Sequence, residues 1–306
     1  MRIAVSEPLD LLLPGVPWLR RLPLGRDQLM LLLAAVSVAL SGLDAWLAHS
    51  AGGTVRGDAW IPVIFGPIAG AILLLAGLIA LRRRMLASVL ATAVFTASIV
   101  VGVLGAWLHL QRAILPSGPP GQRAALDLFF WAPPVLGPLA FAFIGIFGTS
   151  AAWVEMPPGS GQLRLPGNLR LQLPYPKINA YFYITATGVL ITLVSSVLDH
   201  AATGFEDRWL WLPTAGGTFA MVVATVLGMI ERPTKADLWT YVGAMILLLA
   251  IGVVGAGLHL LFDLGPSLQL VPERLLRGAP LMAPLLFSNM GLVGLVALLP
   301  EHKHAG

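Results

Sequence analysis

Four of the six histidines recur at matching positions in the two halves of the chain. His49 and His200 are each followed eleven residues later by Trp and thirteen residues later by Pro. His109 and His259 each follow a Gly-Val-x-Gly-Ala segment, about 150 positions apart and in the same order. Because imidazole is a common ligand of transition metals and of haem iron, this recurrence predicts that the histidines bind a ligand. They could meet within each half, which gives two sites, or across the axis between the halves, where all four could converge on one site.

Glycines occupy the positions four and seven residues before His109 and His259. On an α-helix these positions share the face of the histidine. Such a face lets a flat macrocycle, or the backbone of another helix, approach the helix axis closely. We therefore expect four glycines to line a cofactor site: Gly102, Gly105, Gly252 and Gly255.

Two aspartates lie near the first histidine of each half. Asp44 lies five residues before His49, and Asp199 lies directly before His200. A carboxylate can accept the proton of the ring nitrogen that does not bind the metal, and it then orients the ligand. We expect Asp44 and Asp199 in this supporting role, although a four-residue gap is needed to make the two positions equivalent.

The chain contains no cysteine, which excludes disulfides, thiolate metal sites and Cys-ligated iron–sulfur clusters. Histidine and carboxylate chemistry remains. The predicted cofactor is haem b or a transition metal, copper or zinc, held by His49, His109, His200 and His259. The alternative is a structural role, because an imidazole at the wet end of a helix can bind headgroups or cap carbonyls, while the glycines simply pack helices.

The composition places these residues on membrane-spanning helices. Hydrophobic residues make up 57% of the chain and charged residues 11%, which leaves too little polar surface for a soluble globule of this length. Apolar stretches long enough to cross ~30 Å of hydrocarbon as helices occur at 28–48, 60–81, 86–110, 129–153, 179–199, 209–230, 237–262 and 279–299.

We therefore expect an all-α integral membrane protein with eight transmembrane helices, built as two parallel four-helix repeats. Since each repeat has an even number of spans, the second begins on the same side as the first, and all four repeated histidines lie at one face. The expected domains are an N-terminal cytoplasmic or interfacial segment at 1–27, the first repeat at 28–155, a Pro- and Gly-rich cytoplasmic linker at 156–177, the second repeat at 178–300 and a cytoplasmic tail at 301–306.

The distribution of Lys and Arg predicts the orientation. Thirteen of these residues fall on the side of the termini and six on the other. By the positive-inside rule the termini are cytoplasmic, and the histidines lie at the outer face of what we expect to be a bacterial inner membrane. The basic balance reflects this orientation, so we expect the lipid bilayer as a partner and no nucleic acid.

Prolines mark the expected ends of several spans. A Trp-x-Pro motif begins the second span of each repeat, where Pro is tolerated because its missing N–H has no partner in a first turn. Pro134 with Pro138, and Pro280 with Pro284, lie inside or near the start of the fourth and eighth spans. They are expected to kink these helices or to delay their start.

Three functions are compatible with these features. No span carries Lys, Arg, Asp or Glu near its middle, and the chain has neither a Walker-type loop nor a His-Glu-x-x-His motif. The leading hypothesis is a non-catalytic subunit that serves electron transfer or metal handling beside a membrane or periplasmic protein partner. One rival is a small-solute permease or channel with a polar cavity near Asn289 and the histidines as an outer gate. Another is a cofactor-free membrane scaffold subunit.

Overall fold

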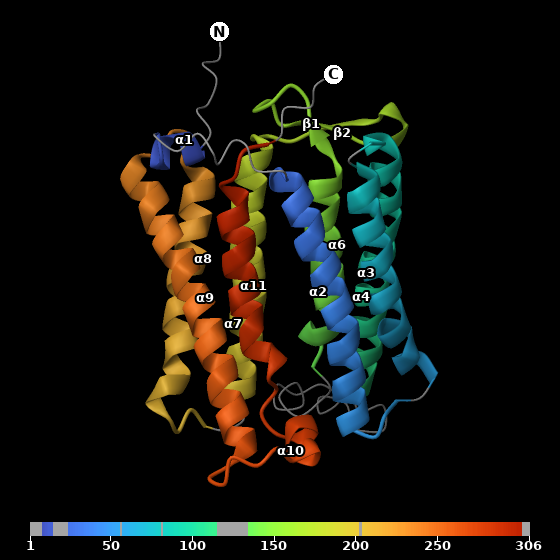
Figure 1. The fold of residues 1–306 in the computed structure, drawn as a ribbon, viewed down its shortest axis with the longest axis vertical. Helices are drawn as coiled ribbons and strands as arrows, with labels where there is room; N and C mark the ends of the chain where they lie inside the picture. The colour runs from blue at the N-terminus through green and yellow to red at the C-terminus, as the bar shows by residue number, and fades with distance from the viewer. Residues whose placement is uncertain are drawn as a thin grey trace.

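The computed structural model describes residues 8–14, 24–55, 57–80, 82–114, 134–201 and 204–301, and it is mainly helical (Figure 1). The long helices are α2 (Arg26–Ala51), α3 (Trp60–Ala80), α4 (Arg84–Ala113), α6 (Leu136–Ala152), α7 (Lys177–Ala201), α8 (Trp211–Met229), α9 (Lys235–Leu264) and α11 (Met282–Ala297). The short segments are α1 (Pro8–Leu12), η2 (Gly57–Ala59), η3 (Pro166–Asn168), η4 (Arg208–Leu210) and α10 (Pro272–Arg277). Of the expected terminal segments, residues 1–7, 15–23 and 302–306 lie outside the described residues.

Six of the helices in the described part of the chain are long and apolar enough to cross a membrane: α2, α3, α4, α7, α8 and α9. Helices α6 and α11 are also apolar, but they contain 17 and 16 residues and are shorter than the spans expected there. Many large apolar side chains on the outer surfaces are exposed, as a lipid-facing surface requires. The chain is an all-α membrane protein in class.

Proline explains why α6 and α11 are short. Pro134 and Pro280 precede these helices, while Pro138 and Pro284 lie in their first turns. Because Pro has no N–H and clashes with the preceding turn, a helix accommodates it most easily in its first turn. Each helix therefore begins two residues after the first proline of its pair. Of the two expected effects, a kink in these helices or a delayed start, the structure shows the delayed start.

The helices pack in two groups of four consecutive helices, which stand side by side (Figure 1). In the first group, α2 and α4 each pack against both α3 and α6. In the second group, α7 and α9 each pack against both α8 and α11. The two groups thus share one pattern of neighbours, which places α2, α4, α7 and α9 parallel to one another.

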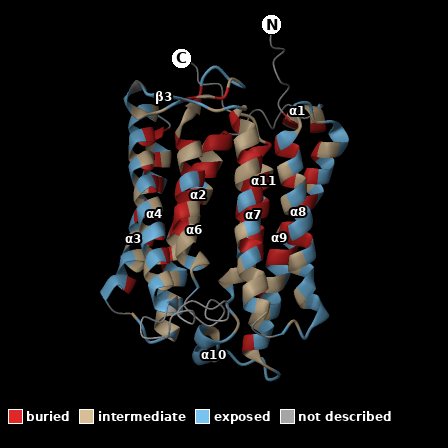
Figure 2. Ribbon diagram, turned by 180° about the vertical axis from the view of Figure 1, so that it is seen from behind, coloured by how far each residue is buried: buried red, intermediate tan, exposed pale blue. Residues whose placement is uncertain are grey.

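Four central helices form the contact between the groups. α2 contacts α11, and α6 contacts α7. Figure 2 shows that buried residues face the helix contacts of the bundle, while exposed residues face outward. At the α2–α11 contact the Asn289 amide donates a hydrogen bond to the Ser37 hydroxyl at 3.1 Å. At the α6–α7 contact Gly188 faces Phe143, which lets the two helices approach closely.

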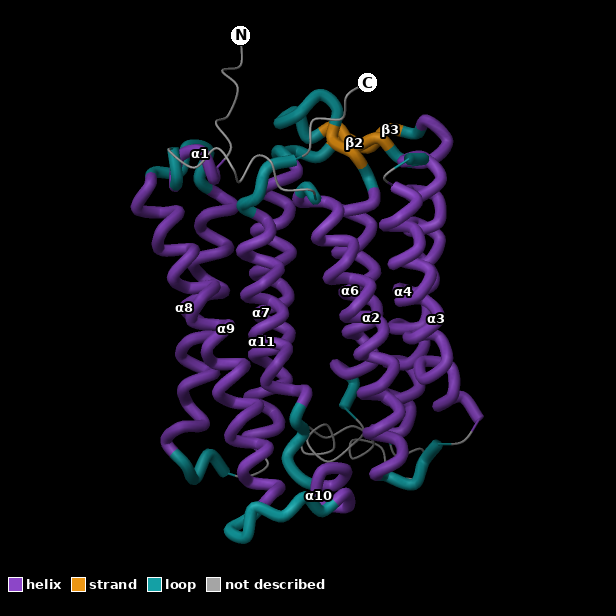
Figure 3. The backbone as a smooth tube through the Cα atoms, in the orientation of Figure 1, coloured by secondary structure: helices purple, strands orange, loops and turns teal. Residues whose placement is uncertain are grey.

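The linker between the groups contains a small antiparallel sheet of order β1-β2-β3, an element that an all-α fold did not predict. Its strands are β1 (Val154–Glu155), β2 (Gln162–Arg164) and β3 (Arg170–Gln172). Figure 3 shows the strands at the end of the bundle where both termini lie. The buried Glu155 carboxylate accepts hydrogen bonds from the backbone N–H groups of Gly159, Gly161 and Lys177, which fixes the turn after β1 and the start of α7.

Candidate functional site

The four repeated histidines lie near the C-terminal ends of four parallel helices, at the end of the bundle opposite the termini. His49 on α2 and His109 on α4 have ring centroids 6.0 Å apart, with the rings nearly perpendicular. His200 on α7 interacts electrostatically with His259 on α9. His49 and His109 therefore meet within the first four-helix group, and the second group brings His200 and His259 within electrostatic range of each other.

Two of the histidines bind the carbonyl of a proline at equivalent positions. The Nδ1 atom of His109 lies 2.9 Å from the Pro134 carbonyl oxygen, and that of His259 lies 3.0 Å from the Pro280 carbonyl oxygen. Four residues later in each case stands another proline, which has no N–H to donate to that carbonyl. Since a carbonyl only accepts, each Nδ1 carries the proton, and the Nε2 lone pair of each ring is left for another partner.

The His49 ring is positioned by a neighbouring hydroxyl. Its Nδ1 lies 3.0 Å from Thr54 Oγ1, which also lies 3.3 Å from the His49 carbonyl oxygen. The single hydroxyl proton can be donated to either of these acceptors, so the contact orients the ring without fixing its tautomer. In the first pair it is His109 whose Nδ1–H is fixed by a carbonyl.

The second pair has a different neighbour at the position equivalent to Thr54. Phe205 lies five residues after His200, as Thr54 lies five residues after His49. The backbone N–H of Phe205 donates to the His200 carbonyl at 3.3 Å, and that of Thr54 donates to the His49 carbonyl at 2.8 Å. The Phe205 ring lies 6.0 Å from the His200 ring and stacks on Trp211. His200 Nδ1 lies 3.5 Å from Ser196 Oγ, the limit for a hydrogen bond. The first pair is thus lined by polar groups, and the second is partly covered by aromatic rings.

Two carboxylates interact electrostatically with the histidine pairs. Asp58 forms an exposed ion pair with Arg112 at 3.9 Å, and both interact electrostatically with His49. Asp199 interacts electrostatically with His259. Thr54, and not Asp44, is the partner shown for His49 Nδ1. Thr54 thus contacts the ring nitrogen of His49 that we expected Asp44 to contact, and the role expected of Asp199 stays a prediction.

The four glycines beneath the histidines face the short helix of their own group. A Cβ on Gly102 would meet Ala142 of α6, and one on Gly252 would meet Ser288 of α11. The other two, Gly105 and Gly255, face Pro138 and Pro284, at 2.8 and 2.9 Å from a Cβ. We expected either a flat macrocycle or another helix beside these glycines. A neighbouring helix occupies the space.

The separation of the first two imidazoles can be compared with that of two rings bound to one ion. In the part of the chain that the structure describes, no group of three or more His, Asp or Glu side chains is arranged to hold a metal ion. Two imidazoles bound to one ion have centroids roughly 5–6.5 Å apart, since each metal–nitrogen bond is ~2 Å and each nitrogen lies ~1 Å from its centroid. The 6.0 Å separation of His49 and His109 falls in this range.

A buried ion cluster lies at the opposite end of the bundle, and the sequence pattern did not predict it. The Lys177 ammonium lies 2.6 Å from Asp27 Oδ2 and 2.6 Å from the Trp153 carbonyl. Tyr181 donates its hydroxyl to Asp27 Oδ1 at 2.8 Å. Two more cations approach the cluster: Arg84 lies 3.5 Å from Asp27, and Arg26 lies 3.3 Å from Glu301.

The spacing along the sequence carried a signal for this cluster. Arg26 and Lys177 are separated by the same 151 positions as His49 and His200, and they are the first residues of α2 and α7. Both belong to the thirteen basic residues that predict the orientation. In the structure both side chains are buried, because Asp27 lies between the helix groups and supplies the opposite charge.

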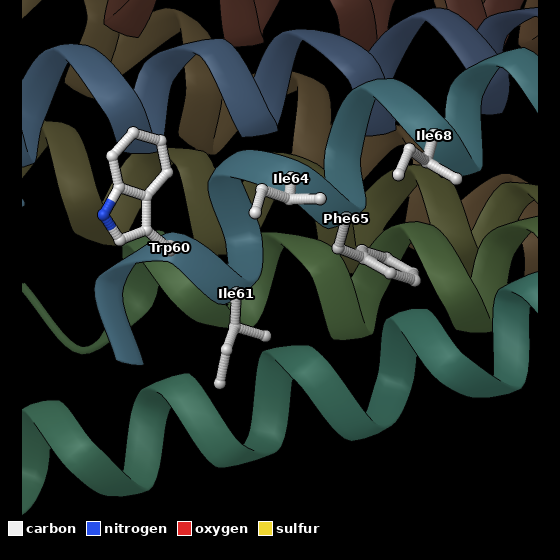
Figure 4. A pocket seen from close by; sticks show the side chains of 5 residues that line it. All are labelled: Trp60, Ile61, Ile64, Phe65 and Ile68. Atoms are coloured by element: carbon white, nitrogen blue, oxygen red, sulfur yellow. The ribbon is translucent and has the colours of Figure 1, made fainter. Parts of the chain in front are cut away.

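An apolar groove on the outer face of α3 is distinct from both clusters. It is lined by Trp60, Ile61, Ile64, Phe65 and Ile68 (Figure 4). With no ionisable group in its lining, it suits contact with lipid chains and offers no ligand to a metal. The chain matches no known protein-family profile, no curated protein and no solved structure.

Proposed function

We propose that this protein is a non-catalytic membrane subunit that binds a transition-metal ion, copper or zinc, through its histidine pairs. One observation carries the proposal: His109 and His259 both donate Nδ1–H to a proline carbonyl and keep the Nε2 lone pair. A backbone carbonyl in this position orients ligating histidines in many metal sites and raises their basicity. Imidazole nitrogen suits copper and zinc.

A single ion suits the site better than a macrocycle. Haem b also takes two axial imidazoles, so the same residues could hold it. A porphyrin would need a flat slot beside the histidines, and the expected slot along Gly102, Gly105, Gly252 and Gly255 is filled by α6 and α11. Haem b is therefore the second candidate; like copper and unlike zinc, it would support electron transfer.

Two protein ligands leave coordination positions open on a copper or zinc ion. Structural zinc sites are closed by four protein ligands, whereas a site with fewer ligands admits water or a group from another molecule. An ion held by His49 and His109 can accept a ligand from a partner protein. We therefore favour metal handling, in which the ion passes between this subunit and a membrane or periplasmic partner.

The proposed setting is a bacterial inner membrane crossed eight times by two parallel repeats. The equal neighbour patterns of the two helix groups support the repeat, as do the matched contacts of His109 with Pro134 and His259 with Pro280. Basic residues gathered at the end that holds the termini support a cytoplasmic position for that end. The histidines then face the outer side.

The test combines metal analysis with an absorbance spectrum of the purified, reduced full chain. We expect copper or zinc to bind, and binding to fall when His109 and His259 are both replaced by Ala. The control is the replacement of Arg232 and Lys235 by Gln, because these two basic residues lie at the end of the bundle opposite the histidines. A haem spectrum would select the haem alternative instead. A colourless protein that binds no added copper or zinc would reject both.

The two rival functions predict different results. A cofactor-free scaffold should assemble equally well with all four histidines replaced. A permease needs a polar path at mid-depth near Asn289, whose amide is hydrogen-bonded to Ser37 between the helix groups. Solute flux that depends on Asn289 and Ser37, in a metal-free protein, would favour the permease.

A further inference from the structure

Three exposed arginines lie at the end of the first helix group, on the side of the termini. Arg82 and Arg83 lie in the loop between α3 and α4, and Arg170 lies on strand β3. The segment η3, which joins β2 to β3, contacts α4, so the sheet lies against the end of the first group (Figure 3). We call these three residues the arginine patch.

Acidic side chains do not neutralise the patch within the described hairpin and loop. The only carboxylate in residues 82–84 and 154–172 is that of Glu155, which is buried and bonded to three backbone N–H groups. The neighbouring Arg84 turns inward to Asp27. The patch therefore presents positive charge at the level where the helices end, which is the level of lipid headgroups.

The duplicated loop of the second group provides a comparison within the same molecule. The segment 231–237 runs from the loop between α8 and α9 into the first turn of α9. It carries two basic residues, Arg232 and Lys235, and two acidic residues, Glu231 and Asp237. Two positive and two negative charges leave this loop neutral. Positive charge is thus concentrated on one of the two loops at this end of the bundle. The membrane orientation of the protein does not explain this difference, because basic residues on either loop would favour the same orientation.

Exposed leucines accompany the arginines. Leu169 is 65% exposed and Leu171 is 42% exposed, and they flank Arg170 on β3. A soluble anion would have no use for these apolar side chains. A membrane surface binds both kinds of residue, since guanidinium groups pair with phosphate while apolar side chains enter the headgroup region.

From this arrangement we infer that the arginine patch binds the headgroups of anionic phospholipids in the surrounding bilayer. Each basic residue near an anionic membrane surface contributes roughly a five-fold gain in affinity. The contribution is electrostatic, so it weakens as the ionic strength rises. The binding surface lies at the opposite end from the histidines and does not depend on the proposed metal site.

The test measures lipid binding to the purified full chain by native mass spectrometry, with phosphatidylglycerol and phosphatidylcholine titrated separately. We expect tighter binding of phosphatidylglycerol, and roughly 25-fold weaker binding when Arg82 and Arg83 are both replaced by Gln. Addition of Arg170→Gln should weaken it further. The matched control, Arg232→Gln with Lys235→Gln, removes two charges from the neutral loop at the same end and should change the affinity less than three-fold.

Three outcomes would overturn the inference. The first is equal affinity for phosphatidylglycerol and phosphatidylcholine, which would also be the result if the patch docked an acidic protein. The second is an equal loss in the Arg82/Arg83 and the Arg232/Lys235 variants, which would indicate a general charge effect. The third is displacement of the lipid by millimolar inorganic phosphate, which would indicate a site for a free anion.

Discussion

The Lys177 ammonium and the Asp27 carboxylate lie 2.6 Å apart, and both side chains are buried at the contact between the two helix groups. Asp27 belongs to the first helix of one group and Lys177 to the first helix of the other. The pair therefore links the two groups directly. Its low-dielectric surroundings make it sensitive to the loss of either partner.

Replacement of Asp27 by Asn should destabilise the protein by about 3–5 kcal/mol, because it leaves Lys177 buried without a counter-charge. Lys177→Met should cost less, since Arg84 still lies 3.5 Å from Asp27. The double variant should recover part of the loss. Thermal unfolding in mild detergent measures these differences. The control is Asp58→Asn, which breaks an exposed ion pair with Arg112 and should cost about 0–1 kcal/mol. Strictly additive effects of the two buried substitutions would contradict the linkage.

Glu301 should make the stability depend on pH. Burial and the negative charge of Asp27 raise the pKa of Glu301 above its ordinary value of 4.5, against the opposing effects of Lys177 and Arg26. The folded state then binds the proton more tightly than the unfolded state, so the contribution is fully present below pH 4.5 and is lost as the pH rises through the folded-state pKa.

The measurement is the melting temperature of the wild type and of Glu301→Gln between about pH 4 and 8. Relative to the variant, the wild type should lose stability with rising pH. The ionised carboxylate lies 3.3 Å from Arg26. A wild type that gained stability relative to the variant as the pH rose would show that this ion pair outweighs the cost of burial.

Gly252→Ala should destabilise the protein by about 1–3 kcal/mol through overpacking. The new Cβ would lie 2.6 Å from the Ser288 backbone nitrogen and 2.7 Å from the Pro284 carbonyl oxygen, and these backbone atoms cannot move independently of α11. Gly257 on the same helix has nothing within 4 Å of an added Cβ. Gly257→Ala should therefore stabilise slightly, by about 0.5–1 kcal/mol, through the higher helix propensity of Ala. Thermal unfolding of both variants checks the prediction, and equal effects would contradict the close packing of α9 on α11.

Thr54→Val should weaken metal binding at the first histidine pair by about 10- to 100-fold, because the substitution removes the group that orients His49. Ser196→Ala in the second group removes a longer contact to His200 and should have a smaller effect. Isothermal titration with zinc or copper measures both, with thermal unfolding as a check on the fold. Unchanged affinity in the Thr54 variant would show that the hydroxyl does not position a ligand.

The sequence by itself determined the class and the arrangement along the chain. Hydropathy depends on composition and length, so it predicted the six membrane-length helices, together with two further spans where the shorter helices α6 and α11 lie; the prolines predicted the delayed start of these two. The recurring motifs marked His49, His109, His200 and His259 as candidate residues. That all four lie at one end followed from the even number of helices in each group.

Only the tertiary structure decided which groups meet. It brought His49 and His109 together, placed Thr54 beside the His49 ring, and filled the glycine faces with α6 and α11. It also buried Lys177 against Asp27, 150 residues away. Such contacts depend on how helices approach and on which charges compensate one another in a low dielectric. Neither property produces a periodic pattern or a compositional bias that can be recognised in the sequence.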